Sequence, residues 1–212
     1  MTILSAFTKN TAKNMQLDAG LLVRGLTDIL NFNGTKEKLK IEDDKKIGAT
    51  SGGSTFSATP EIRNIFEGID GAKGNYKDGN VIDNWEITLT TTVKEMTAKN
   101  LQLAMATADV DSGNDKFDVL TPRMDIKTTD YIDNICWLGT MNGSAEPMII
   151  ELKNVMNTNG ISFTAEDKGS GSVELELKAH FDLSKPDEVP FKIYFPKQTR
   201  TMSMSEFVEN YQ

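Results

Sequence analysis

The sequence predicts a mainly β protein, an antiparallel β-sandwich or barrel with one flanking α-helix. Apolar and polar residues alternate in several short segments, which is typical of strands that bury one face. Gly-rich turns separate these segments, and only one stretch has helical spacing. Strands and helices do not alternate along the chain, so a parallel α/β fold is not expected.

The clearest strands are Trp85 to Val93 and Val173 to Phe181. In each, every second side chain is apolar and those between are polar, so one face is expected to be buried and the other to meet water. Glu86, Glu174 and Glu176 fall on the polar faces. Glu174 and Glu176 are two residues apart on one face, and paired carboxylates on a strand surface are common without catalysis.

The other expected strands are shorter. They are Gly20 to Leu26, Ser54 to Ile62, Tyr131 to Met141, Pro147 to Met156, Ile161 to Ala165 and Phe191 to Phe195. Pro60 lacks a backbone N–H and confines its strand to a sheet edge or a bulge. A Gly-rich turn is expected over Glu67 to Asn75.

One helix is expected from Ala98 to Ala108, with Thr97 as its N-cap and an apolar stripe that faces the sheet. An Asp- and Gly-rich loop follows it. The size of the chain, 212 residues, predicts one domain over residues 1–198, with an N-terminal arm (1–20), a mobile charged loop (31–47) and a separate C-terminal tail (199–212).

Charge excludes one class of function. The chain carries 23 basic and 31 acidic residues and a net charge of −8, so a clamp that grips nucleic-acid phosphates is not expected. No apolar run has the length of a signal-peptide core or a membrane span. Cys136 is the single cysteine and is expected to be a buried, unreactive side chain.

Motifs for catalysis or cofactor binding fail on specific residues, so no cofactor and no enzymatic activity are expected. The Gly48 to Thr55 segment has Ser54 where a phosphate-binding loop requires Lys. The Asp109 to Asp115 segment resembles a calcium loop, but Leu120 stands at the position of the bidentate Glu. His180, the only histidine, is expected on a polar strand face as a solvated side chain.

Several blocks of the sequence, in a conserved order between Gln16 and Pro196, resemble the major tail tube proteins of siphophages infecting Gram-positive bacteria. The blocks are Gln16 to Gly20, Ile47 to Arg63, Val81 to Ile87, Tyr131 to Gly139, Asn157 to Gly160, Glu166 to Gly169 and Pro190 to Pro196. No block is specific alone, and the tail from Thr199 lies beyond the resemblance.

The resemblance implies a structural virion protein that forms hexameric rings with a continuous inner β-barrel. The rings stack into the tail tube, through which DNA passes without specific binding. Implied partners are further copies of the chain and the tape-measure, tail-tip and tail-terminator proteins. The subunit would be assembled in the bacterial cytoplasm, with no membrane association.

The acidic composition suits such a tube, since carboxylates in the lumen would repel DNA phosphates. We take Glu86, Glu174 and Glu176 as lumen candidates, the alternative being an outer solvated face. Contact between rings is assigned to lysines of the charged loop, namely Lys36, Lys38, Lys40, Lys45 and Lys46.

Two alternatives stay open at this point. One is the tube of a contractile tail, a phage-tail-like bacteriocin or a secretion system. The other is a β-sandwich carbohydrate-binding module, which would need aromatic side chains on its surface. Trp85 and Trp137 both occupy apolar strand positions and are expected in the core.

Overall fold

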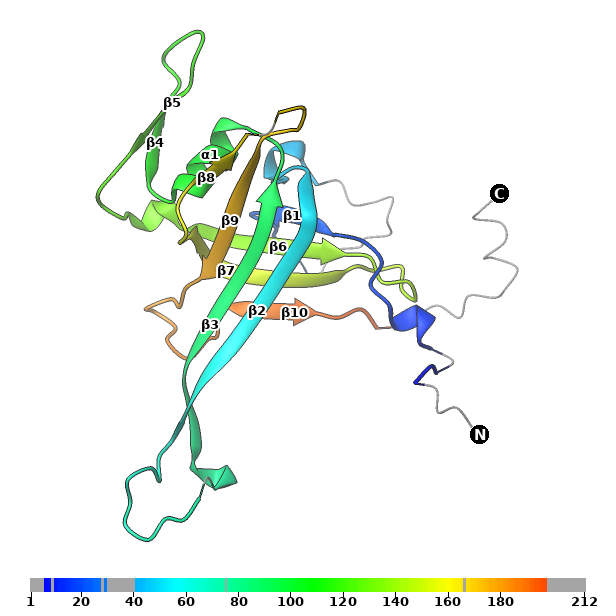
Figure 1. Ribbon diagram of the computed structural model, residues 1–212, viewed down its shortest axis with the longest axis vertical. Helices are drawn as coiled ribbons and strands as arrows, with labels where there is room; N and C mark the ends of the chain where they lie inside the picture. The colour runs from blue at the N-terminus through cyan, green and yellow to red at the C-terminus, as the bar shows by residue number, and fades with distance from the viewer. Residues whose placement is uncertain are drawn as a thin grey trace. The chain divides into compact units, whose positions relative to one another are not determined.

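The computed structural model describes residues 6–8, 10–27, 29, 41–74, 76–165 and 167–197. Over these residues the protein is mainly β, with antiparallel strand pairs and one α-helix, which confirms that part of the predicted architecture. The chain divides into two compact units, Met1–Gly48 with Asn134–Glu151 and Lys192–Gln212, and Ala49–Asp133 with Leu152–Phe191. Figure 1 shows the course of the chain.

The first unit contains a small antiparallel arrangement in the strand order β1-β6-β7, with β10 also paired to β7. Its elements are β1 (Leu21–Arg24), β6 (Ile132–Gly139), the first part of β7 (Met148–Asn157) and β10 (Phe191–Tyr194). Its buried core consists of Val23, Cys136, Leu138 and Ile149. The buried thiol of Cys136 confirms the sequence interpretation.

Trp85 and Trp137 both depart from the prediction of core residues, because each is only half-buried. The Trp137 ring lies over two glycines. A Cβ atom added to Gly20 would stand 2.2 Å from Trp137 Nε1, and one added to Gly139 would stand 2.1 Å from the six-membered ring. The indole N–H donates to the Ala19 carbonyl at 3.0 Å. The glycines therefore provide the space in which a tryptophan covers β1 and β6.

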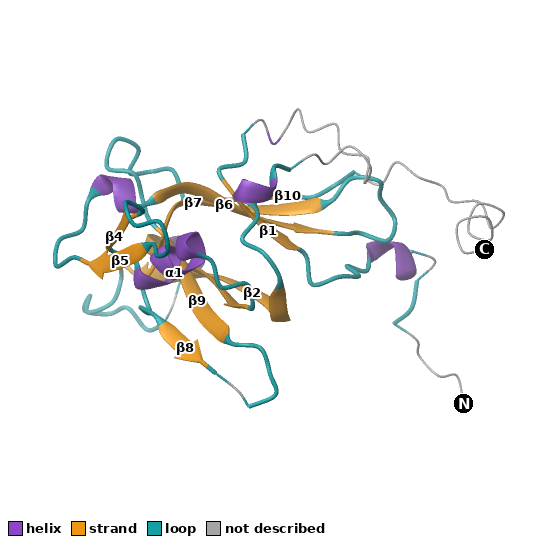
Figure 2. Ribbon diagram, turned by 90° about the horizontal axis from the view of Figure 1, so that it is seen from above, coloured by secondary structure: helices purple, strands orange, loops and turns teal. Residues whose placement is uncertain are grey.

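The second unit contains the strand order β7-β9-β3-β2, with β8 paired to β9. Its strands are β2 (Thr50–Asn64), β3 (Asn80–Val93), β8 (Ser162–Thr164), β9 (Ser172–Ala179) and the rest of β7, together with a separate hairpin of β4 (Ala108–Asp111) and β5 (Val119–Pro122). The helix α1 (Ala98–Met105) contacts β9, β4 and β5 (Figure 2).

The predicted alternation is confirmed in β3 and β9. Ile87, Leu89, Leu175 and Leu177 are almost fully buried, at 0–1% exposure, and the residues between them reach solvent to differing extents. Leu103 and Ala104 of α1 are buried as well. The burial of these apolar side chains is the main stabilising contribution in this unit.

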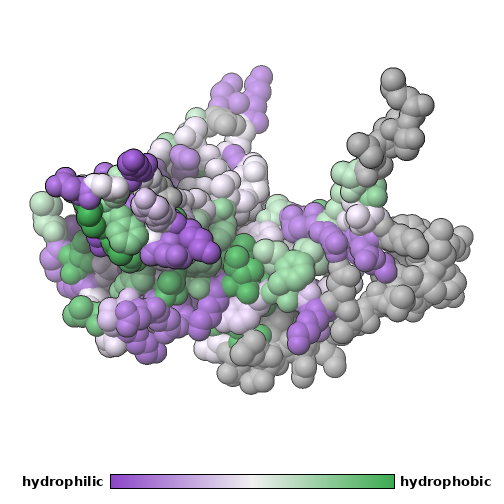
Figure 3. All heavy atoms as spheres, turned by 90° about the horizontal axis from the view of Figure 1, so that it is seen from below, coloured by the Kyte–Doolittle hydropathy of each residue, from purple (hydrophilic) through white to green (hydrophobic). Residues whose placement is uncertain are grey.

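Strand β2 pairs with β3 over almost its whole length, and the paired ribbon continues past the end of β9 (Figure 1). As predicted from Pro60, β2 is an edge strand, and a register shift follows between Glu61 and Ile62. Figure 3 is seen from the side toward which this ribbon points, and apolar and hydrophilic residues intermingle there. Ile62 and Ile82, a register pair near the end of the ribbon, are both at least half-exposed.

The helix begins as predicted and ends earlier. The Thr97 hydroxyl accepts from the Asn100 N–H at 3.2 Å, which confirms the N-cap. The helix ends at Met105 instead of Ala108, because Ala106 has φ of +63° and Ala108 already belongs to β4. The β4–β5 hairpin was not predicted, since Asp and Gly dominate its sequence.

The charged loop predicted over residues 31–47 is described only from Ile41 onward. The described part of the loop contains a 3-10 turn, η3 (Asp43–Lys45). Lys46 forms a bridge with Val23, and the Ile47 N–H donates to the Leu22 carbonyl at 3.0 Å. The end of the segment therefore runs beside β1, which corrects the loop boundary. The predicted tail, residues 199–212, lies outside the described residues, as do parts of the predicted arm, 1–20.

Three further 3-10 turns complete the described secondary structure. They are η1 (Ala12–Asn14), η4 (Lys77–Gly79) and η5 (Thr128–Asp130). The Asp130 carboxylate accepts from the Lys127 N–H at the start of η5, and it also pairs with the Arg123 guanidinium. Arg123 thereby ties the end of the β4–β5 hairpin to η5.

Replacing Gly20 by alanine is expected to destabilise the protein more than the same change at Gly25. Both have positive φ, +78° and +63°, so each alanine costs about 1 kcal/mol of backbone strain. At Gly20 the new methyl group also collides with Trp137, which adds about 1–3 kcal/mol, whereas space is open at Gly25. Urea unfolding of the two variants measures the difference, and equal losses of stability would contradict this account.

Candidate functional site

The three candidate glutamates lie on one face of the β2–β3–β9 sheet. The β3–β9 register sets Thr90 opposite Glu176 and Thr92 opposite Glu174. The β2–β3 register sets Glu86 opposite Thr59. Residues directly opposite one another, and those two apart along a strand, share a face, so the sequence correctly grouped the three carboxylates.

Hydroxyl side chains fill most of the remaining positions on this surface, which we call the polar face. Its members are Thr55, Ser57, Thr59, Glu86, Thr88, Thr90, Thr92, Glu174, Glu176 and Lys178. Glu86 and Glu174 are exposed, and Glu176 is half-buried. The hydroxyl array was missed as a feature of the site, although the run Thr88 to Thr92 was visible in the sequence.

The polar face carries one cation within its strands, and this cation is paired. Lys178 Nζ lies 3.0 Å from Glu86 Oε1. At the end of β3, Lys94 Nζ donates to the Ser170 carbonyl at 3.3 Å. Carboxylates thus outnumber ammonium groups on the face, and neither of these two lysines is without a partner.

Asn157, at the end of β7, positions the strand that carries Glu176. Its side chain is fully buried. The amide oxygen accepts from the Glu176 N–H at 2.8 Å, and the amide nitrogen donates to the carbonyls of Ala104 at 2.6 Å and Gly160 at 3.0 Å. One side chain therefore connects β9, the C-terminal turn of α1 and the turn before β8.

The lysine candidates for ring contact lie in the first unit or outside the described residues. Lys36, Lys38 and Lys40 are outside them. Lys45 lies 3.6 Å from Glu42, and Lys46 lies 2.6 Å from Asp43. Both described lysines are thus paired within their own segment, an arrangement that the run of three acidic residues followed by two lysines, from Glu42 to Lys46, could have indicated.

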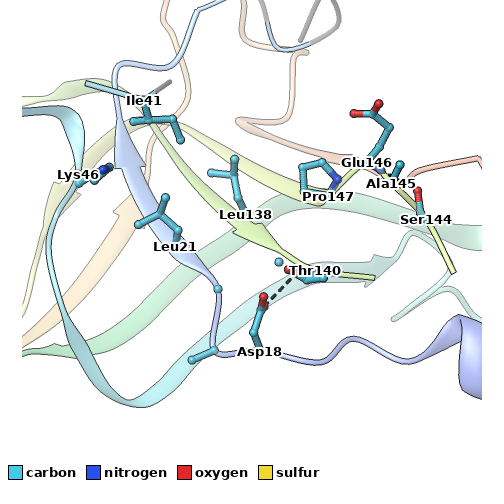
Figure 4. A pocket seen from close by; sticks show the side chains of 13 residues that line it. Asp18, Leu21, Ile41, Lys46, Leu138, Thr140, Ser144, Ala145, Glu146 and Pro147 are labelled. Atoms are coloured by element: carbon cyan, nitrogen blue, oxygen red, sulfur yellow. Dashed lines mark hydrogen bonds between the residues drawn. The ribbon is translucent and has the colours of Figure 1, made fainter. Parts of the chain in front are cut away.

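A cavity of about 540 Å³ lies in the first unit beside Asp18 (Figure 4). The Asp18 carboxylate points toward Thr140 and accepts from its backbone N–H at 3.1 Å and from Gln16 Nε2 at 3.0 Å. Partial burial opposes ionisation, but these hydrogen bonds outweigh it and lower the pKa of Asp18. The carboxylate is thus hydrogen-bonded within the protein itself, and no sequence pattern indicated the cavity.

Glu151 is a buried carboxylate in the first unit, with 6% exposure. It accepts from the Tyr194 hydroxyl at 2.8 Å and from Asn134 Nδ2 at 3.2 Å. Burial raises the pKa of the Cys136 thiol to about 12, and the nearby Glu151 charge adds to the effect. Burial and the hydrogen bond to Glu151 raise the pKa of Tyr194 to about 12. The hydrogen bond from Tyr194 to Glu151 therefore links β10 to β7.

The residues considered above as catalytic, phosphate-binding or calcium-binding candidates each have structural contacts of their own. His180 is half-buried, which corrects the expected solvated position. Its ring meets Tyr131 edge-on at 5.1 Å, and Nδ1 lies 3.1 Å from the Asn154 carbonyl. Gly52 and Gly53 form an irregularity in β2, and the Asp111 carboxylate accepts from the Gly113 N–H in the β4–β5 loop.

The described part of the chain holds no group of three or more His, Cys, Asp or Glu side chains placed to bind a metal ion. Within the same residues, no helix has the length and apolar character needed to cross a membrane. No protein-family model matches the chain, and the search of curated proteins finds no match.

Asn157→Ala is expected to cost about 2–4 kcal/mol of unfolding free energy, because it leaves the buried Ala104 carbonyl, the Gly160 carbonyl and the Glu176 N–H without their partner. Asn159→Ala is the matched control, since Asn159 is exposed two residues away. Chemical denaturation measures both variants. A loss at Asn157 no greater than that at Asn159 would show that the amide does not hold these segments together.

Stability is expected to fall as the pH rises from about 9 to 12. In that window the unfolded chain releases protons from Cys136 and Tyr194 that the folded chain keeps, since their pKa values rise from 9.0 and 10.0 to about 12. Cys136 alone contributes a loss of about 1 kcal/mol by pH 10. Urea titrations at several pH values check this. The Cys136→Ala variant should fall less steeply, and parallel curves would contradict the assignment.

Proposed function

We propose that this chain is the structural subunit of a phage tail tube. In this proposal it assembles as stacked hexameric rings, strands from neighbouring subunits continue into one inner β-barrel, and the polar face lines the lumen through which DNA passes. Partners are further copies of the chain and the tape-measure, tail-tip and tail-terminator proteins. The protein would act in the virion after assembly in the bacterial cytoplasm, with no catalytic step.

The composition of the polar face is the observation that carries the proposal. A channel for DNA needs a wall that is hydrated and does not hold phosphates. Hydroxyl groups supply hydration without charge. Glu86, Glu174 and Glu176 outnumber the one cation within the strands of the face, Lys178, so its net charge is negative and repels a polyanion. The opposite side of the same strands is apolar and buried, so one sheet could serve as both core and wall.

The position of β2 supports assembly through strand pairing. Among the described strands of the second unit, β2 lies at the end of the order and pairs on one side only. Its exposed positions include Thr55, Ser57 and Thr59, with no lysine to block pairing there. Between Ser54 and Thr59 this edge carries no proline, no charged residue and no register shift, and an unprotected stretch of this kind favours pairing with another chain. A neighbouring copy that paired there would extend the polar face around a ring.

The proposal is tested by electron microscopy in negative stain, together with size-exclusion chromatography and light scattering over a series of concentrations. Hollow rings or tubes with six-fold symmetry are expected. A species that stays monomeric at all concentrations, and also fails to polymerise with tail-tip components, would overturn the proposal.

The same architecture would serve a contractile tail, a phage-tail-like bacteriocin or a secretion tube, and a sheath gene beside this one would favour that alternative. A carbohydrate-binding module is less well supported. Trp85 packs against Phe191 with ring centres 5.7 Å apart, and Phe191 packs against Phe56 at 5.6 Å. These aromatic side chains contact one another instead of lining a groove for a sugar.

A further inference from the structure

We infer that Glu86 is a masking residue: it neutralises Lys178, so that the polar face offers no ammonium group to a phosphate. This inference rests on the proposed function, since it explains how a wall that contains a lysine avoids holding DNA. It assigns the three glutamates unequal roles. Glu174 and Glu176 add to the negative field, whereas Glu86 cancels a specific cation.

The geometry of the pair supports this assignment. Lys178 is opposite Thr88 in the β3–β9 register, and Glu86 lies two residues from Thr88 on the same face, so the side chains meet diagonally. Their charged atoms are 3.0 Å apart. The Lys178 side chain is 35% exposed and that of Glu86 is 64% exposed, so the ammonium group lies within reach of solvent but beneath a more exposed carboxylate.

The neighbours of Lys178 leave it dependent on Glu86. Opposite it lies a neutral threonine, Thr88, which is itself opposite Ser57. Glu176 lies on the same face. Its backbone N–H donates to the Asn157 side chain, and its carboxylate forms no ion pair with Lys178. Removal of the Glu86 charge would therefore expose an ammonium group in the middle of a hydroxyl surface, a setting suited to a phosphate oxygen.

The other cation within β2, β3 and β9 also pairs with a carboxylate. Arg63, near the end of β2, donates to both oxygens of Asp83 at 2.7 and 3.0 Å. Arg63 and Lys178 are the basic residues within β2, β3 and β9, and each has a carboxylate from β3 as its partner. Exposed ion pairs contribute little to stability, so masking explains these pairs better than a gain in folding free energy does.

The test compares binding of a short DNA duplex to two full-length variants at low salt, measured by fluorescence anisotropy. Glu86→Gln and Glu174→Gln change the net charge equally, but only the first uncovers Lys178. We expect Glu86→Gln to bind the duplex about fivefold more tightly than Glu174→Gln does, an advantage that high salt abolishes. Equal binding by the two variants, or no detectable binding by either, would overturn the inference.

Two double variants separate masking from other effects. Glu86→Gln with Lys178→Met should lose the added affinity, because no ammonium group remains. Glu86→Lys with Lys178→Glu retains a pair with its charges exchanged, and it should bind no more tightly than the original protein. If the exchanged pair bound as tightly as Glu86→Gln does, position and not pairing would decide affinity, and the inference would be wrong. Thermal unfolding checks that each variant is folded.

The DNA-binding and assembly experiments distinguish a failure of the inference from a failure of the proposed function. Rings or tubes without a difference between the two single variants would leave the tube subunit in place and remove the masking role. A difference between the variants without any assembly would show that the pair suppresses phosphate binding on a protein that is not a tube subunit.

Discussion

The register between β3 and β9 is the constraint on which the rest of the second unit depends. Leu89 lies opposite Leu177, and Thr90 lies opposite Glu176, so apolar pairs and polar pairs alternate across the two strands. A shift by one residue would carry the glutamates into the core and the leucines into water. The same pairing therefore fixes both the buried layer and the polar face.

This register is held at several points outside the two strands. The Asn157 side chain accepts a hydrogen bond from the Glu176 N–H and donates one to the carbonyl of Ala104 near the end of α1. The helix α1 contacts β9, and Thr97 caps its N-terminus. On the other side, β2 follows β3 and presents Thr55, Ser57 and Thr59 on the same face as the threonines of β3. The polar face is thus a consequence of the packing behind it, and its residues need no direct contact with one another to stay aligned.

Sequence reasoning recovered the elements in which side-chain period and backbone requirements agree. The alternation in β3 and β9, the cap at Thr97 and the edge position of Pro60 were all predicted. It missed the β4–β5 hairpin, whose strands have only four residues each. It ended the helix too late because the apolar stripe continued to Ala108. It placed Trp137 in the core, since nothing in the spacing showed that Gly20 and Gly139 leave room for a ring at the surface.

The candidate site was predictable only in part. The two-residue repeat of β-strands placed Glu86, Glu174 and Glu176 on polar faces. Only the pairing of strands that lie far apart in the sequence brings these faces onto one surface. The contact between Glu86 and Lys178 is diagonal and spans 92 positions, so no local pattern could reveal it. The role of Asn157 was hidden likewise, because a buried amide in a strand has no signature apart from its partners.

The central claim is that the polar face lines a channel. A helical reconstruction by cryo-electron microscopy of the assembled protein tests it most directly, because it locates each strand relative to the axis. The account predicts that Thr55, Thr90 and Glu176 face the lumen and that β2 pairs with a neighbouring subunit. A reconstruction in which these residues lie on the outer wall, or in which β2 remains an unpaired edge, would contradict it.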